Sequence, residues 1–310
     1  MKPDASGEGP PAAAMRCGFV ALIGAPNVGK STLVNALVGA KVTIVSRKVQ
    51  TTRALIRGII VEDNAQLVLV DTPGIFAPKR RLDRAMVLTA WTGAHDADLV
   101  CVLLDAKLGI DAEADTILTT LANVAHTRIL VINKIDLVPR EKLLALAKAA
   151  NDRLKFEDTF MISALSGDGI GDLRQALARL VPAGPFHYPE DQMSVAPLRH
   201  LAAEITREKI FQELHQELPY QSTVETDSWT DRKDGSVRIE QTIFVERESQ
   251  RKIVLGKGGA SIKSIGAEAR KEIAEITGQT VHLFLFVKVR ENWGDDPDRY
   301  REMGLEFPRE

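Results

Sequence analysis

The sequence predicts two folds in succession: an α/β fold with a mostly parallel sheet, and then a smaller α+β fold. Three observations support this prediction. A glycine-rich loop at residues 24–31 lies between an apolar run and a helical pattern. Continuous apolar runs at residues 98–104 and 128–132 are typical of parallel strands buried on both faces. Residues 181–197 contain four prolines and little apolar pattern, which indicates a linker between the two halves.

Length, composition and charge limit the class of protein. A chain of 310 residues with a net charge of −2 is long enough for about two domains. No apolar run approaches the roughly 18 residues of a membrane span. Residues 1–15 lack the apolar core of a signal peptide, so we expect a disordered tail there. Cys17 and Cys101 lie within apolar runs and are expected to be buried free thiols, which together with the other features predicts a cytoplasmic protein.

Residues 24–31 read G-A-P-N-V-G-K-S and match the phosphate-binding loop G-x-x-x-x-G-K-[ST] at every fixed position. A strand at 19–23 precedes the loop, and a helix that ends at Gly39 follows it, so an anion would meet a helix N-terminus. Lys30 is expected to reach the β and γ phosphates, and Ser31 to bind Mg²⁺. The residues predicted to contact the phosphates are Gly24, Ala25, Pro26, Asn27, Val28, Gly29, Lys30, Ser31 and Thr32.

Residues 41–53 are polar and basic around a few β-branched residues. They are compatible with an ordinary surface loop. In GTPases with a phosphate-binding loop, however, this place holds a mobile switch whose Thr closes over Mg²⁺ and the γ phosphate. Thr52 is our choice for that Thr, and Thr51 is the alternative.

Two β-like runs at 54–61 and 66–70 are joined by a short polar turn, which predicts a hairpin and one antiparallel edge of the sheet. The second run ends in D-T-P-G, which comprises Asp71, Thr72, Pro73 and Gly74. A carboxylate at a strand end can hold Mg²⁺, and a glycine can bring its N–H to the γ phosphate. Residues 75–84, beginning with Ile75, are expected to form a second switch with little periodicity.

The apolar runs at 98–104 and 128–132 are expected to be central strands, with a crossover helix at 113–121 between them. The second run ends in N-K-I-D. Asp136 can accept hydrogen bonds from two donors of guanine, and adenine offers no such pair. A buried carboxylate left unpaired would penalise ATP by several kcal/mol. Asn133 and Lys134 are expected to brace the loops and cover the base.

A last short strand at 159–162 leads to S-A-L-S-G, where Ser163, Ala164 and Leu165 are expected to contact the guanine oxygen through backbone N–H groups. A helix at 171–180 with leucines on one face then closes the first domain, which we place at 16–181. The predicted metal ligands are Ser31, Thr52 and Asp71.

After the linker at 182–197, the pattern predicts a helix at 198–218 and strands at 222–230 and 237–247. G-K-G-G then precedes a helix with Ile262, Ile265, Ala269 and Ile276 on one face, and a third strand follows at 279–289. The glycines are also compatible with a simple helix-capping turn, and the basic residues with a solvated face. The tail at 291–310 contains Trp293 and Tyr300, which are expected either to pack on the groove beside the G-K-G-G loop or to offer a stacking surface.

The four motifs of the first half, in this order, resemble those of Ras-like GTPases of the translation-factor-related class. Ras carries a water-orienting Gln where this chain has Ile75, so intrinsic hydrolysis is expected to be slow. GTPases that have a hydrophobic residue at this position and a P-N-V-G-K-S loop often use K⁺, held partly by the loop Asn. By resemblance, that residue is Asn27 here. Our hypothesis is that K⁺ replaces an arginine finger. The implied catalytic residues are Lys30, Thr52 and Asn27.

The order helix–strand–strand–helix–GxxG–helix–strand resembles a type II KH domain, placed at 198–290, in which the glycines let RNA phosphates approach closely. The implied RNA-binding residues are Arg251, Lys252, Gly256, Lys257, Gly258, Gly259 and Lys263. Because the G-K-[ST] ending is missing, this loop is not a second nucleotide phosphate loop.

From residue 15 onward the chain resembles the Era family of GTPases, with S-R-K-V-Q-T-T-R, Y-Q-S-T-V-E-T-D and E-N-W as further shared segments. The resemblance implies GTP or GDP and Mg²⁺ as ligands, the 3′ end of 16S rRNA and the 30S subunit as partners, and a monomer. It also implies a mostly cytoplasmic protein with peripheral contact to the bacterial inner membrane. The alternative is a GTPase switch whose carboxy-terminal domain binds a protein or a membrane instead of RNA.

Overall fold

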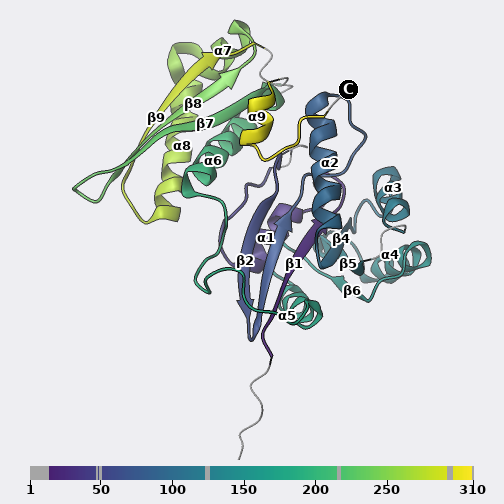
Figure 1. Ribbon diagram of the computed structural model, residues 1–310. Helices are drawn as coiled ribbons and strands as arrows, with labels where there is room; N and C mark the ends of the chain where they lie inside the picture. Colours follow the sequence, from purple (N-terminus) through teal and green to yellow (C-terminus); the bar gives the residue numbers. More distant parts are fainter. Residues whose placement is uncertain are drawn as a thin grey trace, which may run out of the picture.

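The computed structural model describes residues 14–46, 48, 51–122, 126–214, 218–291 and 296–308. Two units lie side by side, each with its own sheet. Figure 1 shows strands β1 to β6 with their helices in one unit and strands β7 to β9 with theirs in the other. Most of the predicted amino-terminal tail, residues 1–13, lies outside the description.

The sheet of the first unit has six strands in the order β2-β3-β1-β4-β5-β6. Only β2 runs antiparallel to its neighbour, so the prediction of one antiparallel edge is confirmed. Since the other strands are parallel, the loops that follow them meet at one edge of the sheet. The strands are β1 (Arg16–Ile23), β2 (Ile56–Glu62), β3 (Ala65–Asp71), β4 (Leu99–Asp105), β5 (Thr127–Asn133) and β6 (Asp158–Met161).

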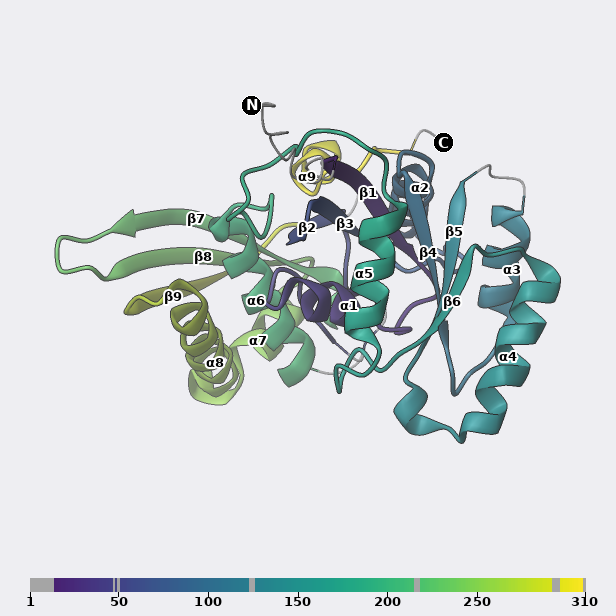
Figure 2. The ribbon, with the colours of Figure 1, turned by 90° about the horizontal axis from the view of Figure 1, so that it is seen from below.

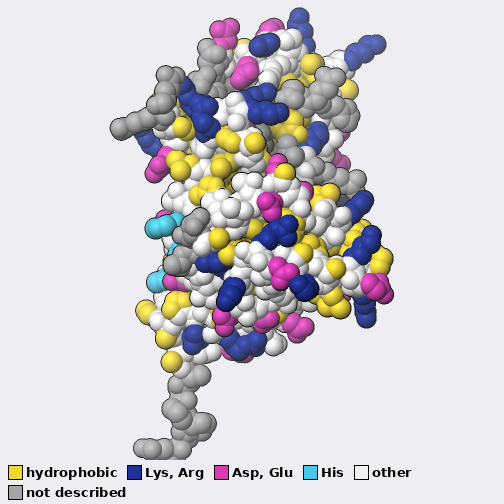
Figure 3. Space-filling model, turned by 90° about the vertical axis from the view of Figure 1, so that its right-hand side faces the viewer, with side chains coloured by type: hydrophobic (Ala, Val, Ile, Leu, Met, Phe, Trp, Pro, Cys, Tyr) yellow, Lys and Arg dark blue, Asp and Glu magenta, His cyan; other side chains and the backbone are white. Residues whose placement is uncertain are grey.

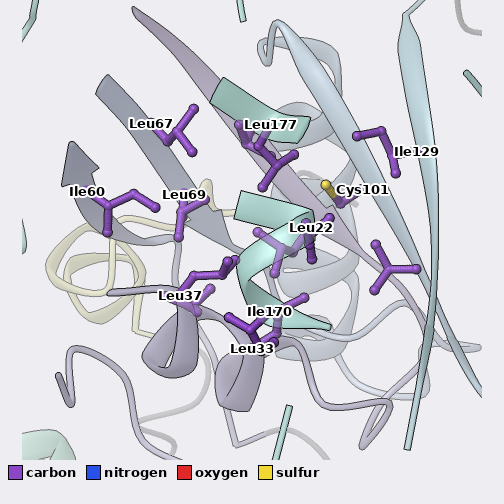
Figure 4. Packing of buried hydrophobic residues seen from close by; sticks show 14 of the residues in the cluster. Leu22, Leu33, Leu37, Ile60, Leu67, Leu69, Cys101, Ile129, Ile170 and Leu177 are labelled. Carbon is purple, nitrogen blue, oxygen red and sulfur yellow. The ribbon is translucent and has the colours of Figure 1, made fainter. Parts of the chain in front are cut away.

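Helices cover both faces of this sheet. The helices are α1 (Lys30–Val38), α2 (Arg81–His95), α3 (Ala112–Leu121), α4 (Arg140–Arg153) and α5 (Ile170–Leu180). One apolar cluster joins the sheet to α1 and α5, and Figure 4 shows Leu33 and Leu37 of α1 and Leu177 of α5 directed at strand residues such as Leu69. A second cluster joins the opposite face to α2 and α3. Gly39 ends α1 in the left-handed region at φ 77°, as predicted.

The prediction that residues 75–84 form an irregular second switch is partly wrong, because α2 begins at Arg81. Asp83 accepts hydrogen bonds from the main-chain N–H groups of Lys79 and Arg80 at 3.0 and 2.9 Å, which starts the helix. Ala85 and Met86 then pack against the protein interior. Small alanines in a charged segment gave too weak a periodicity to reveal this helix from sequence.

The second unit has a three-stranded sheet in which β8 is central, antiparallel to β7 and parallel to β9. The elements are α6 (Leu198–Glu213), β7 (Ser222–Asp231), β8 (Val237–Val245), α7 (Glu248–Leu255), α8 (Ala260–Thr277) and β9 (Val281–Val289). Figure 2 shows α8 on one side of these strands. The helix predicted at 198–218 ends at Glu213 because Leu214 is extended; a short 3₁₀ segment, Leu218–Gln221, follows after residues outside the description.

The proline-rich segment 182–197 runs from the start of central strand β1 to the outer edge of β2. Cys17 donates its N–H to Pro182 O at 3.0 Å, and Ile59 on β2 donates to Met193 O at 2.9 Å. The segment therefore covers the outer edge of β2, where an exposed row of backbone groups would otherwise invite pairing with another chain.

Both cysteines are buried free thiols, as predicted. Burial raises the pKa of the Cys101 thiol to about 12, so this side chain is chemically inert and serves the apolar core.

One of our two expectations placed the carboxy-terminal tail on the groove beside the G-K-G-G loop. This expectation is wrong, because the tail packs elsewhere. Its short helix α9 (Pro297–Glu302) and the residues after it lie against α2 of the first unit, as Figure 1 shows. Tyr300 is fully buried in a cluster with Met86 and Leu305, and its ring lies edge-on to Phe307 at 4.9 Å. Tyr300 is therefore a packing residue and offers no stacking surface; Trp293 lies outside the described residues.

Candidate functional site

The phosphate-binding loop, residues 24–31, turns sharply between β1 and α1. Asn27 and Gly29 adopt positive φ values of 60° and 101°, and a Cβ on Gly29 would lie 2.3 Å from Asn133 Nδ2. Only glycine fits there. Lys30 is buried and donates from Nζ to the carbonyl oxygens of Gly24 and Ala25, both at 2.9 Å. Burial lowers the pKa of Lys30 to about 8, although the Asp71 carboxylate opposes this shift.

Oxygen ligands suitable for Mg²⁺ meet at the start of α1. Ser31 Oγ donates to Asp71 Oδ2 at 2.7 Å and lies 2.9 Å from Thr52 Oγ1. Thr43, which sequence reasoning missed, also donates to Asp71 Oδ2 at 2.9 Å. Asp71 is fully buried, and its Oδ1 has no hydrogen-bond partner among the described residues. Burial raises the pKa of this carboxyl, so a cation beside it would be strongly favoured.

The competing switch residue, Thr51, does not reach this cluster. Its hydroxyl donates to Lys48 O at 2.8 Å, whereas Thr52 Oγ1 lies 3.4 Å from Asp71 Oδ2. The geometry therefore brings Thr52, rather than Thr51, together with Ser31 and Asp71.

Asn133 ties together the loops that would hold a base. Its Nδ2 donates to Val28 O at 2.9 Å, and its Oδ1 accepts from Ala164 N at 3.0 Å. Lys134 donates from Nζ to Asn27 O and to Asp105 Oδ2, both at 2.6 Å. The predicted bracing of the phosphate loop by Asn133 and Lys134 is therefore present in the geometry.

A cavity of about 890 Å³ runs from the phosphate loop to the N-K-I-D segment. This volume is ample for a nucleotide. The predicted residues that line it are Pro26, Asn27, Gly29, Lys30, Ser31, Thr32, Thr52, Thr72, Gly74, Asn133, Lys134, Asp136 and Leu165. Residues of the predicted switch at 41–53 also line the cavity, namely Ile44, Val45, Ser46, Lys48 and Thr51. Lining residues that the sequence analysis missed are Leu137, Phe211 and Gln212.

Predicted nucleotide contacts that do not line the cavity are Gly24, Ala25, Val28, Asp71, Pro73, Ile75, Ser163 and Ala164. The Ile75 side chain is buried in the apolar cluster beneath α2, although its N–H donates to Gly24 O at 3.1 Å. The N–H groups of Ser163 and Ala164 donate to Asp168 O and to Asn133 Oδ1, so in this structure both are already in use.

The base end of the cavity is more open than predicted. Asp136 is exposed, whereas the sequence analysis treated it as a buried carboxylate. Leu137 and Leu165 are also exposed, the latter at 85%, and both line the same end of the cavity. Two exposed leucines beside a carboxylate form an apolar slot with one acceptor, which suits a flat heterocycle that carries N–H donors.

The second unit forms one wall of this cavity, because the switch at 41–53 is docked on α6. Ile44 is only 1% exposed and belongs to the apolar cluster of the second unit, together with Leu201 and Ile205. Glu208 on α6 is buried and accepts from Val45 N at 2.7 Å and from Lys41 Nζ at 2.5 Å.

Further contacts hold the end of the same switch. Arg207 donates to Thr51 O, and Lys48 donates to Leu214 O. Arg53 is buried and donates to Ser222 O at 2.9 Å at the start of β7. The segment that carries Thr52 is thus fixed to the second unit along most of its described length.

The G-K-G-G loop joins α7 to α8. Gly256, Gly258 and Gly259 have φ values of 71°, 61° and 79°, and a Cβ on Gly258 would meet open space. Apart from Lys257, the loop therefore presents bare backbone at the N-terminus of an 18-residue helix that has no acid in its first turn. This arrangement suits a phosphate.

The predicted basic residues differ in their surroundings. Lys252, Lys257 and Lys263 are exposed. Arg251 instead bridges α7 to β9, since it donates to Val287 O at 3.2 Å and pairs with Glu248 at 2.9 Å. Arg251 is held as a structural clamp, while the three lysines around the loop are available to phosphates.

Elsewhere the surface charge is mixed. Figure 3 shows cationic and anionic side chains interspersed over the face that carries α3 and α4. No helix within the described residues is long and apolar enough to cross a membrane.

Each of the two units contains one family match. Residues 19–134 match the family described as 50S ribosome-binding GTPase, and residues 217–294 match the KH domain family.

Several curated proteins are similar over the whole chain. GTPase Era of Bradyrhizobium diazoefficiens is 80% identical over 310 residues and covers 100% of both chains. GTPase Era of Bradyrhizobium sp. (strain BTAi1) is 82% identical over 300 residues, or 97% of both chains.

Solved structures are similar over nearly as much. A single-site variant of Aquifex aeolicus Era bound to GDP.AlF4⁻ superposes with a TM-score of 0.88 at 36% identity, covering 94% of this chain and 99% of that chain. The structure of Era in complex with MgGDPNP and nucleotides 1506–1542 of 16S ribosomal RNA has the same TM-score, identity and coverage of both chains.

Proposed function

Because this chain belongs to the Era family of GTPases, we propose that it is a GTP-hydrolysing switch that binds the 3′ end of 16S rRNA during assembly of the 30S subunit. The observation that carries the proposal is the docking of the 41–53 switch on the second unit, with Ile44 in the apolar cluster of that unit and Glu208 bonded to the switch backbone. A nucleotide that rearranges this switch must also change its contacts with the unit that binds RNA.

The nucleotide is a guanine nucleotide with Mg²⁺, as in the solved relatives. Ser31, Thr52 and Asp71 would hold the ion, and the orphaned Oδ1 of buried Asp71 fits this assignment. The ion supplies charge neutralisation at the phosphate oxygens. Lys30 would exchange its bonds to two loop carbonyls for bonds to phosphate. Asp136 would accept hydrogen bonds from guanine while Leu137 and Leu165 contact its faces.

Hydrolysis is expected to be slow without an activator, because the Ile75 side chain lies in the core and offers no hydrogen bond to water. Asn27 lines the cavity, which supports the hypothesis that it helps to hold K⁺ near the phosphates. Turnover should be faster in KCl than in NaCl at equal ionic strength, and Asn27→Ala should lose this preference. Equal rates of the unchanged protein in both salts would contradict the hypothesis.

RNA binding is assigned to the G-K-G-G loop and its lysines, where open space outside Gly258 leaves room for a phosphate. The test is Gly258→Asp, which adds a negative charge there. Gly278→Asp is the matched control, because Gly278 has a similar φ of 67° and open space at the far end of α8. We expect Gly258→Asp to lose about tenfold or more in affinity for a 16S 3′-end oligonucleotide, since phosphate contacts dominate such binding.

The same measurement separates the alternatives. If Gly258→Asp and Gly278→Asp bind RNA as tightly as the unchanged protein, the second unit serves a protein or membrane partner instead. If RNA affinity is the same with GDP and with a non-hydrolysable GTP analogue, the proposed coupling is wrong.

Location and assembly state rest on the resemblance. We propose a monomer of the cytoplasm that makes peripheral contact with the inner membrane. Flotation of the purified protein with anionic lipid vesicles, at several salt concentrations, tests the membrane contact.

A further inference from the structure

One strand of the second unit shows an unusual outer face. Along β9, Leu283, Leu285 and Val287 pack on the apolar clusters beneath the sheet. The alternate side chains point to the opposite face, because successive residues of a strand alternate. That outer row consists of His282, Phe284, Phe286 and Lys288.

The two aromatic side chains of this row are the exposed ones. Phe284 is 43% and Phe286 is 48% exposed, and no other Phe, Tyr or Trp in the part of the chain that the structure describes is classed as exposed. Scattered exposed leucines are ordinary on a protein surface, but neighbouring exposed aromatic rings mark contact surfaces. Phe284 and Phe286 are separated by about 7 Å along the strand, so each ring can receive one flat ligand group.

The charges around the rings are mixed. Glu240 of β8 lies opposite Phe284 in the sheet register, and Asp227 accepts a hydrogen bond of 2.6 Å from Thr242, which lies opposite Phe286. The outer row of β9 has a lysine and a histidine and no acid. The Arg238 guanidinium lies 4.7 Å from the centre of the Phe284 ring, although it also pairs with Glu240 at 2.5 Å. Because opposite charges balance around the rings, the rings themselves are the binding feature of this face, and flat unpaired bases suit them.

The row is also continuous with the loop assigned to RNA. Arg251 on α7 donates to Val287 O of β9 at 3.2 Å, and α7 leads directly into Gly256. Figure 1 shows β9 beside α7 and α8 at the edge of the sheet. Because β9 is the edge strand of its sheet, RNA that leaves the G-K-G-G loop on the helix side would pass around this edge to reach the outer face.

We propose that the outer face of β9, defined by His282, Phe284, Phe286 and Lys288, is a stacking strip for an unpaired RNA segment that continues from the G-K-G-G loop. Phe284 and Phe286 each stack on one base, and Lys288 lies beside the backbone. The inference rests on the proposed RNA-binding function and adds a second, separate contact to it. Because stacking supplies most of the binding, the contribution of the strip depends little on salt, unlike that of the lysines around the loop.

The test compares two RNAs that share the segment bound by the G-K-G-G loop, one short and one extended by four unpaired nucleotides at either end. The variant is Phe284→Leu with Phe286→Leu, which keeps apolar side chains but removes the rings. Leu144→Ala, an exposed position on α4, is the control. Affinities are measured by fluorescence anisotropy at two salt concentrations, and circular dichroism checks the fold.

The double variant should lose about thirtyfold or more in affinity for the extended RNA, because it removes two stacking contacts that are each worth about fivefold or more. It should bind the short RNA as the unchanged protein does, and the loss should be similar at both salt concentrations. An ultraviolet crosslink from the extended RNA should map to Phe284 or Phe286.

Equal affinity of the double variant and the unchanged protein for the extended RNA would overturn the strip, and so would an equal loss for both RNAs. In either case, the proposed function would still stand if the unchanged protein binds both RNAs tightly and Gly258→Asp abolishes that binding. If the unchanged protein binds neither RNA, the proposed function fails and the strip fails with it.

Discussion

Glu208 on α6 accepts a hydrogen bond of 2.7 Å from the main-chain N–H of Val45, so a side chain of the second unit fixes the backbone of the nucleotide switch. The same carboxylate pairs with Lys41 at 2.5 Å and lies 3.4 Å from Lys209. Lys41 and Lys209 also pair with Glu272 on α8, the helix that begins at the G-K-G-G loop. A largely buried charge network therefore connects the switch to α6 and α8 of the second unit.

Glu208→Ala should weaken the coupling of the two units. It removes the acceptor for Val45 and one of the two acidic partners of Lys41 and Lys209, so one of the contacts between the switch and α6 is lost. Couplings between sites are typically about 1–3 kcal/mol. We expect the ratio of RNA affinities with GTP analogue and with GDP to move toward one, as measured by anisotropy. Glu213→Ala, an exposed acid at the end of the same helix, should keep the ratio of the unchanged protein.

Asp136→Ala should reduce guanine specificity. Loss of two charge-assisted hydrogen bonds lowers the affinity for GDP by about 2–4 kcal/mol, or roughly 30- to 1,000-fold. Affinity for ADP should hardly change, because adenine offers no donor pair to this carboxylate. Competition with a fluorescent nucleotide measures both. Asp152→Ala, an exposed acid on α4, is the control, and an unchanged preference for GDP in Asp136→Ala would assign base recognition to other groups.

Because of Lys30, the affinity for nucleotide should fall at alkaline pH. Its folded pKa of about 8 lies below the ordinary value of 10.5 because the ammonium is buried. A bound phosphate favours the charged form, so binding requires proton uptake once the pH exceeds about 8. Affinity for GDP should then weaken by up to about tenfold per pH unit. Calorimetry from pH 7 to 9.5 should show this trend, and Lys30→Met should lack it apart from titration of the nucleotide itself.

The same lowered pKa affects stability with a definite sign. Between about pH 8 and 10.5 the unfolded chain holds more protons at this lysine than the folded chain. The Lys30 contribution to the free energy of unfolding therefore rises with pH across that window in the absence of nucleotide. Lys30→Met should flatten this rise, which denaturant titrations at several pH values would detect; an identical rise in both proteins would assign it to other groups.

Tyr300→Ala should destabilise the first unit although the residue belongs to the tail. The side chain is fully buried against Ala85 and Met86 of α2, and loss of a large buried aromatic side chain costs about 3–5 kcal/mol. Thermal unfolding should shift downward, and hydrogen exchange in α2 should increase. Tyr188→Ala, a half-buried residue of the linker, should leave exchange in α2 unchanged. Protection of α2 that survives Tyr300→Ala would show that the tail does not hold this helix.

The loops of the first unit were predictable from sequence because local chemistry determines them. Glycines with positive φ at Gly29 and Gly39, a lysine that needs an anion, and polar residues directly after buried strands each leave a local signal. Elements that depend on long-range packing leave no such local signal, so they could not be predicted from sequence. Helix α2 begins in a charged segment and is held by alanines, which give little periodicity, and by Tyr300 from far along the chain.

The far wall of the nucleotide cavity was also beyond sequence reasoning. Phe211 and Gln212 lie in a helix of the second unit, and nothing in their own neighbourhood relates them to a phosphate loop. Conversely, Ile75 and Ala164 belong to nucleotide-binding motifs, but packing and internal hydrogen bonds engage them elsewhere. Motifs specify which backbone segments approach the ligand, whereas tertiary packing decides which side chains remain available.

Ile44 gives the arrangement a practical consequence. Its side chain finds its apolar neighbours in α6 and in the sheet of the other unit, not in its own. An isolated amino-terminal fragment would therefore carry a water-exposed isoleucine in the segment proposed as the nucleotide switch. Nucleotide affinities and turnover rates obtained from such a truncation would describe a switch released from its natural restraint, and full-length protein is the proper material for enzymology.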